Sequence, residues 1–394
     1  MMASSIDPIP RTNMHISSPP SDGSMRAKAM HDVSSAGNSS TRILSFSWLR
    51  ILGTIAVITL HVLFTGAGIH EDDISDTQYI VTEMIVSLTM WAVPVFLMVS
   101  GTLLLDPSRE ISISKIFKKY LKRVLVALLL CSVLFRIIDI VMDGEPFTLF
   151  NLLVAFKELF TGDGWSHLWY LYLLVGIYLC LPFFRMIARH LDRQSTVLLI
   201  VLSVVFLSVL PTLEGFDLYS AFYIPMQTIY PFYFFLGYIL KEYTVIKSDA
   251  VLTSSVGRNH GLYRKTAWTL LIVGMLLSLL FSWMSYQPGL ENFSVFRNYY
   301  ALPVVMQSVG IFMLFLHWKP ARLPKIVALL DSQSFGIYLL HMILVRLILR
   351  YWSFNPYLYT GPMTILLYAV LIVLILFITL GVTLLLKKFL QFSF

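Results

Sequence analysis

The chain has too few charged residues for a soluble domain of its length. Of its 394 residues only 13% are charged and 57% are hydrophobic, whereas soluble domains carry about a quarter charged residues. Most of its side chains must therefore face lipid or pack in an apolar interior. The composition predicts an all-α, polytopic membrane protein and excludes a soluble protein with a single anchor.

Cysteine and the common metal and nucleotide motifs are also scarce. The two cysteines, Cys131 and Cys180, both fall within apolar runs, so a disulfide framework is excluded and no metal site is indicated. The sequence has no phosphate-cradling glycine loop, no HExxH motif and no serine-hydrolase elbow. We therefore expect no metal, no permanently bound cofactor and no ATP hydrolysis.

Long hydrophobic runs begin only after residue 42. Residues 1–42 are rich in Ser, Pro, Gly, Asn and Asp without apolar periodicity, which predicts a disordered tail. Residues 43–394 form the predicted membrane domain. Ten runs in it can cross roughly 30 Å of hydrocarbon: 44–66, 80–105, 117–142, 167–188, 195–213, 222–240, 266–286, 299–317, 334–352 and 363–386.

Basic and acidic residues alternate between successive loops. The tail, the even-numbered loops and the C-terminal end are rich in Lys and Arg, whereas the other loops are acidic or neutral. Basic loops remain in the cytoplasm, so both termini are predicted to be cytoplasmic, in a multi-pass protein of the inner (plasma) membrane. The net charge of +7 then reflects topology, and no nucleic-acid partner is expected.

An arginine and a histidine share one face of the first run. Arg50 and His61 have ten residues between them, and at about 100° and 1.5 Å per residue they lie on nearly the same helix face, roughly 16 Å apart. Arg50 would sit at the cytoplasmic interface and His61 near mid-membrane. Arginine suits phosphate binding and neutral histidine suits general-base catalysis. The alternative is that Arg50 reaches lipid headgroups and His61 bonds a neighbouring helix.

A second candidate site lies at the cytoplasmic mouth of the third run. Lys118, Lys119, Lys122 and Arg123 follow one another closely, and residues four apart share a helix face. Together they could bind a polyphosphate. Each of them could equally be an ordinary cytoplasmic flanking charge.

Two more histidines accompany aromatic residues. His167 and Trp169 begin the fourth run on the outer side; an interfacial aromatic belt explains Trp169, but the pair also suits an extracytoplasmic sugar. Tyr338 and His341 share a face near the cytoplasmic start of the ninth run. Intramembrane histidines indicate a polar cavity, with a helix–helix hydrogen bond as the alternative.

The second run carries a proline and small residues. Pro94 is expected to kink the helix, and Gly101 to permit close approach of another backbone. Ser100 and Glu83 are further candidates for a cavity, although no base lies near Ser100 in the sequence.

Four segments, in order, resemble the acyltransferase-3 family of integral membrane acyltransferases. The resemblance covers about residues 43–394 and is greatest for the branch with the O-acetyltransferase of enterobacterial common antigen and the polysaccharide adhesin modifier of staphylococci. The family's ten spans agree with the ten runs above. The matching segments are the Arg50–His61 spacing in span one, VPVFLMVSG (93–101) in span two, HLWYLYLLVGIYLCLP (167–182) in span four and SFGIYLLH (334–341) in span nine.

Two positions depart from the family's pattern. The family usually has an acidic residue three positions before the arginine, where this chain has Ser47, so that carboxylate must be absent or supplied elsewhere. The family's basic pair in span three, often two arginines, is here the lysine-rich stretch 118–123, which keeps the charge but weakens the case for bidentate binding.

The resemblance implies a membrane O-acyltransferase. Acyl-CoA, with acetyl-CoA as the default, would bind from the cytoplasm as donor substrate, and a hydroxyl of a cell-surface or lipid-linked carbohydrate would accept the acyl group. Arg50 and the stretch 118–123 would hold the coenzyme's phosphates, while His61 would deprotonate the hydroxyl or become transiently acylated. The expected cavity residues are Glu83, Ser100, His167, Trp169, Tyr338 and His341.

The main alternative is a transporter or flippase for a polysaccharide or lipid-linked sugar, without acyl transfer. Ten spans with midplane histidines suit a substrate pathway. No clear repeat relates the two halves of the sequence, which weakens this interpretation. A non-catalytic membrane sensor is a third hypothesis, disfavoured by the four acyltransferase-like segments.

Overall fold

The computed structural model describes residues 22–222, 228–249 and 256–390, and every regular element in them is a helix. The all-α prediction is confirmed. The elements are α1 (Asp22–Ile69), α2 (Asp76–Ser87), α3 (Ala92–Leu104), α4 (Ile113–Lys115), η1 (Ile116–Leu121), α5 (Lys122–Asp143), α6 (Leu149–Thr161), η2 (Ser166–Leu168), α7 (Trp169–His190), α8 (Arg193–Val204), η3 (Val205–Val209), α9 (Leu210–Leu213), η4 (Glu214–Phe216), α10 (Tyr230–Asp249), α11 (Val256–Met284), η5 (Glu291–Arg297), α12 (Leu302–His317), α13 (Lys325–Arg346), η6 (Leu347–Tyr351), η7 (Pro356–Leu358) and α14 (Pro362–Leu390).

Nine helical segments of the described residues are long and apolar enough to cross a membrane. They coincide with nine of the ten predicted runs, which confirms a polytopic membrane protein. The remaining run, 222–240, includes residues 223–227, which lie outside the described residues. The rest of that run begins α10, whose later part carries the charged residues Lys241 and Glu242, and α10 is not among the nine.

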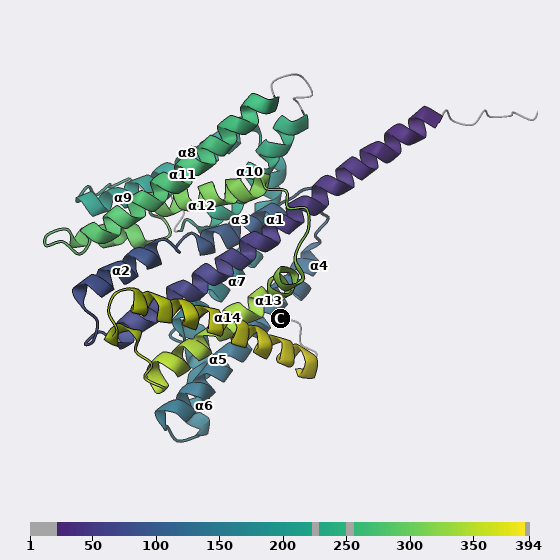
Figure 1. The fold of residues 1–394 in the computed structure, drawn as a ribbon. Helices are drawn as coiled ribbons and strands as arrows, with labels where there is room; N and C mark the ends of the chain where they lie inside the picture. The colour runs from purple at the N-terminus through teal and green to yellow at the C-terminus, as the bar shows by residue number, and fades with distance from the viewer. Residues whose placement is uncertain (1–21, 223–227, 250–255, 391–394) are drawn as a thin grey trace, which may run out of the picture.

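Helix α1 lies at the centre of the bundle, between two groups of helices (Figure 1). One apolar core joins α1 to α5, α7, α13 and α14, and it contains Ile58 and Leu339. The other joins α1 to α3, α10 and α12, and it contains Leu49 and Phe312. Residues on α1 are therefore able to face both halves of the molecule.

The N-terminal part of α1 differs from the sequence expectation. Composition predicts a disordered tail over residues 1–42, but α1 already begins at Asp22 and projects beyond the bundle in Figure 1. Extending a helix that is already nucleated costs far less than starting one, so this polar segment can continue the helix of the first span. Residues 1–21 lie outside the described residues.

The second span is two helices rather than one kinked helix. α2 ends at Ser87 and α3 begins at Ala92, and the hydroxyl of Thr89 in the break donates to the carbonyl of Val86 at 2.7 Å. Pro94 is the third residue of α3, where a missing N–H costs nothing because the first turn has no acceptor for it. The expected kink at Pro94 is thus a full break within the span.

Glycines bring α3 and α10 into backbone contact. A Cβ atom at Gly101 would overlap the carbonyl oxygen of Phe234, and one at Gly237 would overlap that of Met98. The predicted close approach at Gly101 is confirmed. Because only glycine fits at either position, the two helices fix each other's place.

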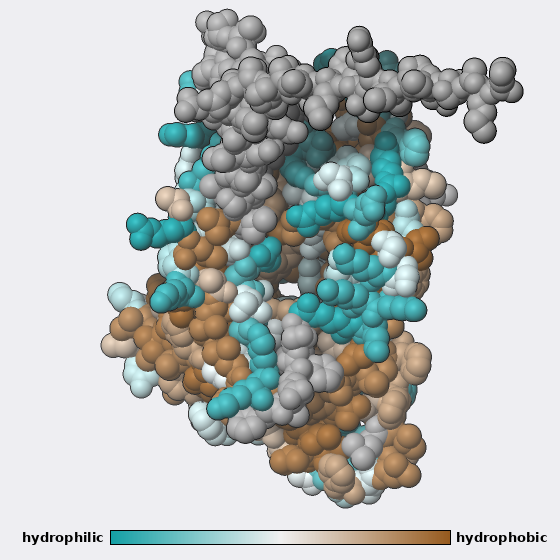
Figure 2. Space-filling view, turned by 90° about the vertical axis from the view of Figure 1, so that its right-hand side faces the viewer, coloured by the Kyte–Doolittle hydropathy of each residue, from teal (hydrophilic) through white to brown (hydrophobic). Residues whose placement is uncertain are grey.

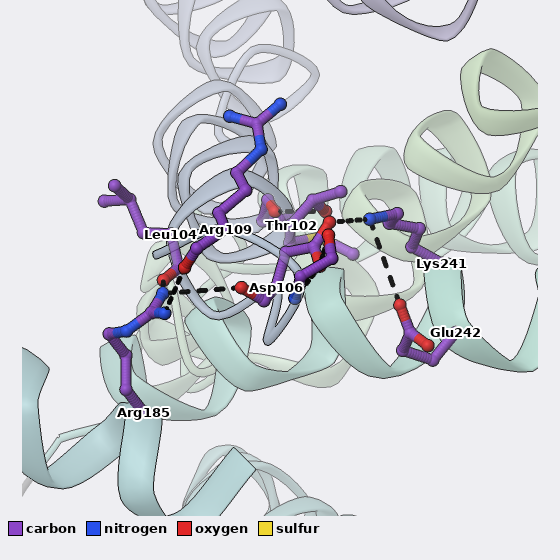
Figure 3. A network of polar contacts seen from close by, with 9 residues as sticks. Thr102, Leu104, Asp106, Arg109, Arg185, Lys241 and Glu242 are labelled. Carbon is purple, nitrogen blue, oxygen red and sulfur yellow. Dashed lines mark hydrogen bonds and ion pairs between the residues drawn. The ribbon is translucent and has the colours of Figure 1, made fainter. Parts of the chain in front are cut away.

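Beyond this crossing, a polar network holds the end of α3 (Figure 3). The guanidinium of buried Arg185 donates to the backbone carbonyl of Leu104, at the end of α3, and to that of Arg109 in the following loop. The first of these bonds supplies a partner for a carbonyl that the helix end leaves unpaired. Lys241 pairs with Asp106 at 2.5 Å. Burial alone would raise the pKa of the Asp106 carboxyl, but hydrogen bonds from Lys241 and Ser108 outweigh it and hold that pKa below its ordinary value.

Candidate functional site

Three histidines from three distant spans meet beside the break in the second span. His61 comes from α1, His167 from η2 and His341 from α13. The ring centroids lie 5.0 Å apart for His61 and His341, 5.6 Å for His167 and His341, and 6.2 Å for His61 and His167. We call these residues the histidine cluster. Among the described residues, no group of three or more His, Cys, Asp or Glu side chains is arranged to hold a metal ion.

Backbone carbonyls determine which nitrogen of each ring carries the proton. Nδ1 of His61 lies 3.0 Å from the carbonyl oxygen of Val57, and Nδ1 of His341 lies 2.7 Å from that of Tyr338. A carbonyl can only accept, so both Nδ1 atoms donate. Nε2 of His341 is then an acceptor and lies 3.1 Å from Nδ1 of His61. In this arrangement Nε2 of His61 keeps a free lone pair, as a general base requires.

His167 has the opposite arrangement. Its Nε2 lies 3.3 Å from the carbonyl oxygen of Leu339 and donates to it, which leaves Nδ1 as an acceptor. This Nδ1 atom is buried and has no hydrogen-bond partner. An unpaired buried acceptor is costly, so Nδ1 of His167 is suited to receive a hydroxyl or amide proton from a bound molecule.

The histidine cluster borders a cavity of about 20 Å³, which is room for little more than one water molecule. His61 is partly exposed, whereas His167 is 1% and His341 0% exposed, so His61 is the histidine that a small reactant can reach. Residues from five helical elements and two loops line the cavity: Val57, Leu60, His61, Thr89, Ala92, Val93, His167, Trp169, Tyr170, Tyr299 and Tyr338.

The break in the second span gives this cavity a helix end. Ala92 and Val93, the first two residues of α3, line it together with Thr89. The N-terminal end of a helix carries partial positive charge, although the N–H of Ala92 already donates to the carbonyl oxygen of Thr89 at 3.1 Å. The cavity therefore combines a histidine lone pair with an environment that favours developing negative charge.

Arg50 is held by an acidic residue that sequence analysis missed. Its Nε and one terminal nitrogen donate to the two carboxylate oxygens of Asp331 at 2.7 and 2.8 Å, and the same terminal nitrogen lies 3.4 Å from the hydroxyl of Ser47. Asp331, on α13, thus supplies the carboxylate that is absent at Ser47. Its place in the sequence, three residues before the motif 334–341, was the available signal.

One of the four predicted basic residues, Arg123 of α5, packs against the face of α13 that carries Asp331. The guanidinium of Arg123 sits 5.0 Å from the ring centroid of Phe335, and Phe335 follows Asp331 by four residues, one helix turn. Lys118, Lys119 and Lys122 have exposed side chains. Arg123 and Arg50 therefore contact the same side of α13, and Arg123 is exposed like the three lysines.

Figure 2 looks onto the end of the molecule where α4 and the C-terminal end of α14 lie, the predicted cytoplasmic end. Hydrophilic residues gather on this face around a central hollow. The sequence assigns the basic loops to this end. An anionic molecule approaching from the cytoplasm would meet this polar face first.

The structure brings together most, but not all, of the predicted cavity residues. His167, Trp169 and Tyr338 line the cavity with His61, and His341 contacts His61 directly. Ser100 is outside the cavity lining, on α3 and about 12 Å beyond Ala92 along the helix.

Glu83 also lies outside the cavity. Its carboxylate is 2% exposed and pairs with Arg297 of η5, whose terminal nitrogen also bonds the hydroxyl of Tyr286 at 2.9 Å. Tyr170, which lies in the segment 167–182, and Tyr299 also line the cavity. Sequence analysis missed Tyr299, which has no local pattern to distinguish it from packing residues.

Comparison with known families places the chain by its match to a family model. A family model described as "Acyltransferase domain", that of the acyltransferase-3 family, matches residues 43–386. Neither the comparison with curated proteins nor that with solved structures gives a significant match.

Proposed function

The chain belongs to the acyltransferase-3 family of membrane acyltransferases, and we propose that it transfers an acyl group from cytoplasmic acyl-CoA to a hydroxyl of a cell-surface or lipid-linked carbohydrate. The proposed donor is acetyl-CoA and the proposed location is the inner (plasma) membrane. The observation that carries the proposal is the partly exposed His61, whose Nε2 lone pair is free while two buried histidines surround it.

The proposed reaction is a direct transfer at His61. Nε2 of His61 accepts the proton of the acceptor hydroxyl while its oxygen bonds to the acyl carbon. The carbon–sulfur bond then breaks, and the proton passes from His61 to the departing thiolate. The products are the ester and free coenzyme A, with His61 neutral again. Nδ1 of His167 would accept a hydrogen bond from a neighbouring hydroxyl of the acceptor and so orient it, and the first turn of α3 would favour the negative charge of the intermediate.

Arg50 has a different role in this proposal. It lies about three helix turns from His61 along α1, too far to touch the reacting atoms. The Asp331 carboxylate fixes its guanidinium through two hydrogen bonds, and Arg123 lies on the same side of α13. Together they would hold phosphates of coenzyme A, with its pantetheine arm directed inward to His61.

Mass spectrometry of surface glycan from a deletion strain tests the proposal and identifies acyl group and acceptor together. The deletion should remove an O-acyl group, the wild-type gene should restore it, and a gene carrying His61→Ala should not, at equal protein level. Restoration by His61→Ala would overturn the role of His61. An unchanged glycan in the deletion strain would overturn acyl transfer to carbohydrate.

A further inference from the structure

A second, larger cavity lies directly beyond the aromatic wall of the histidine cavity. Its volume is about 500 Å³, and we call it the outer pocket, because the predicted topology places it at the outer face. It is formed by the ends of η3, α9 and η4, by the start of α10 and by the loop before α12. The described residues that line it include Phe206, Pro211, Glu214, Tyr230, Asn298, Tyr299 and Tyr300.

The chemistry of the outer pocket suits a hydroxylated, uncharged molecule. Exposed Glu214 and Asn298 provide a carboxylate and an amide that can bind hydroxyl groups. Three tyrosines offer flat apolar faces with polar tips. None of its described lining residues is Lys, Arg or His, so nothing in the lining would balance a phosphate or a carboxylate, and Glu214 would repel either one.

One tyrosine separates the outer pocket from the histidine cavity. Tyr299 lines both spaces. Its ring centroid lies 5.5 Å from that of Trp169, which lines the histidine cavity, and 6.1 Å from that of Tyr230, which lines the outer pocket. Trp169 and Tyr230 are themselves 5.5 Å apart. These three rings form the partition between the two spaces.

The backbone on either side of this partition is held firmly. The hydroxyl of Tyr233, a fully buried residue, donates to the carbonyl oxygen of Tyr299 at 2.7 Å. The N–H of Leu302 donates to the hydroxyl of Thr212 at 3.0 Å, which ties the loop to α9. With this backbone in place, movement of the side-chain rings is what would open a path from the outer pocket to His61, and rotamer changes of this kind are fast.

We propose that the outer pocket binds a neutral sugar residue of the acceptor, with Glu214 and Asn298 bonded to its hydroxyls and its reactive hydroxyl directed past Tyr299 to His61. This inference rests on the proposed acyl transfer and adds the acceptor's binding site and its charge class. The bonds made and broken are the same as in the direct transfer at His61, because Glu214 only binds the sugar and forms no covalent bond.

The test uses membranes with matched amounts of full-length protein. Labelled acetyl-CoA is the donor, and the acceptor is envelope glycan isolated from the strain that carries His61→Ala. Glu214→Gln keeps the size of the side chain and removes its charge. Asp217→Asn is the matched control, because Asp217 is an exposed acid three residues along that contacts Asn292 outside the outer pocket.

Glu214→Gln should raise KM for the glycan roughly tenfold, as expected for loss of a charge-assisted hydrogen bond, and leave KM for acetyl-CoA unchanged. Asp217→Asn should change neither constant. A glycan KM for Glu214→Gln within twofold of the wild-type value would overturn the outer pocket as the acceptor site. The proposed function would still stand in that case, provided that wild-type protein transferred acetyl groups faster than His61→Ala. Acyl groups found only on acidic sugars would overturn its charge class. If wild type and His61→Ala gave equal rates, the proposed function itself would fail, and this inference with it.

Discussion

Two helix crossings near the centre of the molecule are built in opposite ways. α3 crosses α10 at Gly101 and Gly237, where backbone meets backbone and no side chain fits between. α1 crosses α13 through polar side chains, with Arg50 bonded to Asp331 and His61 to His341. The first crossing is held by close backbone packing. The second brings together four ionisable side chains, two from α1 and two from α13.

The difference separates structural from functional parts of the fold. Small residues at a helix crossing give close packing at little cost in a membrane. Ionisable residues there are expensive to desolvate and persist where they do chemistry or bind charge. The α3–α10 crossing therefore fixes the place of α3, and the α1–α13 crossing would carry the proposed reaction.

The largest effect on stability should come from Gly237→Ala. Its Cβ would overlap the carbonyl oxygen of Met98 and force α3 and α10 apart, at a cost of about 3 kcal/mol or more. We expect little folded protein in detergent extracts by size-exclusion chromatography. Gly381→Ala, at a glycine with nothing within 4 Å, should accumulate normally. Equal yields of the two variants would contradict the packing account of this crossing.

Asp331→Ala should come next in size. It leaves the guanidinium of Arg50, 27% exposed, without its partner, and the free energy of unfolding should fall by about 2 kcal/mol, less than for a fully buried pair. Arg50→Ala with Asp331→Ala should be no less stable than Asp331→Ala alone, as measured by thermal unfolding.

The ion pair of Asp143 and Arg350, at the predicted outer end, is the control for these Arg50 and Asp331 variants, because the Arg350 side chain is 51% exposed. Asp143→Ala should cost less than about 1 kcal/mol, as is usual for exposed ion pairs. A larger loss of stability for Asp143→Ala than for Asp331→Ala would refute the claim that the ion pair at the α1–α13 crossing stabilises the fold more than an exposed pair does.

His341→Phe should lower kcat while leaving KM for acetyl-CoA unchanged. In the proposed reaction His341 acts through His61, whose Nδ1 atom lies 3.1 Å from Nε2 of His341, so it would be a positioning residue. We expect a loss of about tenfold to a hundredfold in kcat, with partial rescue in His341→Gln. His190→Ala, at an exposed histidine on α7, is the control. Unchanged kcat in His341→Phe would remove His341 from the reaction.

A smaller effect than that of Asp331→Ala should come from Lys241→Met, on α10 beside the end of α3. The ion pair of Lys241 with Asp106 contributes stability at neutral pH, because the folded-state pKa of the Asp106 carboxyl lies below the ordinary value of 3.8. We expect a loss of about 1 kcal/mol near neutral pH that shrinks as pH falls below about 4, where Asp106 begins to take up a proton. Thermal unfolding across pH measures it, and a loss that stayed constant to low pH would contradict the ion-pair account.

Sequence patterns predicted the spans well, because a long apolar run is a strong signal that needs no partner. They also singled out the three histidines that the structure brings together, since an ionisable residue inside a span is conspicuous on its own. They did not predict the pairing of Arg50 with Asp331, which is 281 residues away. Such a contact depends on how the helices pack, and no local pattern encodes it.

The break in the second span was only half predicted. Pro94 indicated a disturbance, but the turn before it depends on the hydroxyls of Ser87 and Thr89 bonding nearby carbonyls. Likewise, nothing in the sequence distinguished Tyr299 from the many aromatic residues that only pack. Its position between two cavities follows from the assembled fold.

The most direct test of the account is the initial rate of acetyl transfer from labelled acetyl-CoA to glycan, measured in membranes with equal amounts of wild-type and His61→Ala protein. The account predicts that His61→Ala loses about a thousandfold in kcat, as for removal of a general base, at unchanged affinity for acetyl-CoA. A rate within twofold of wild type would contradict it.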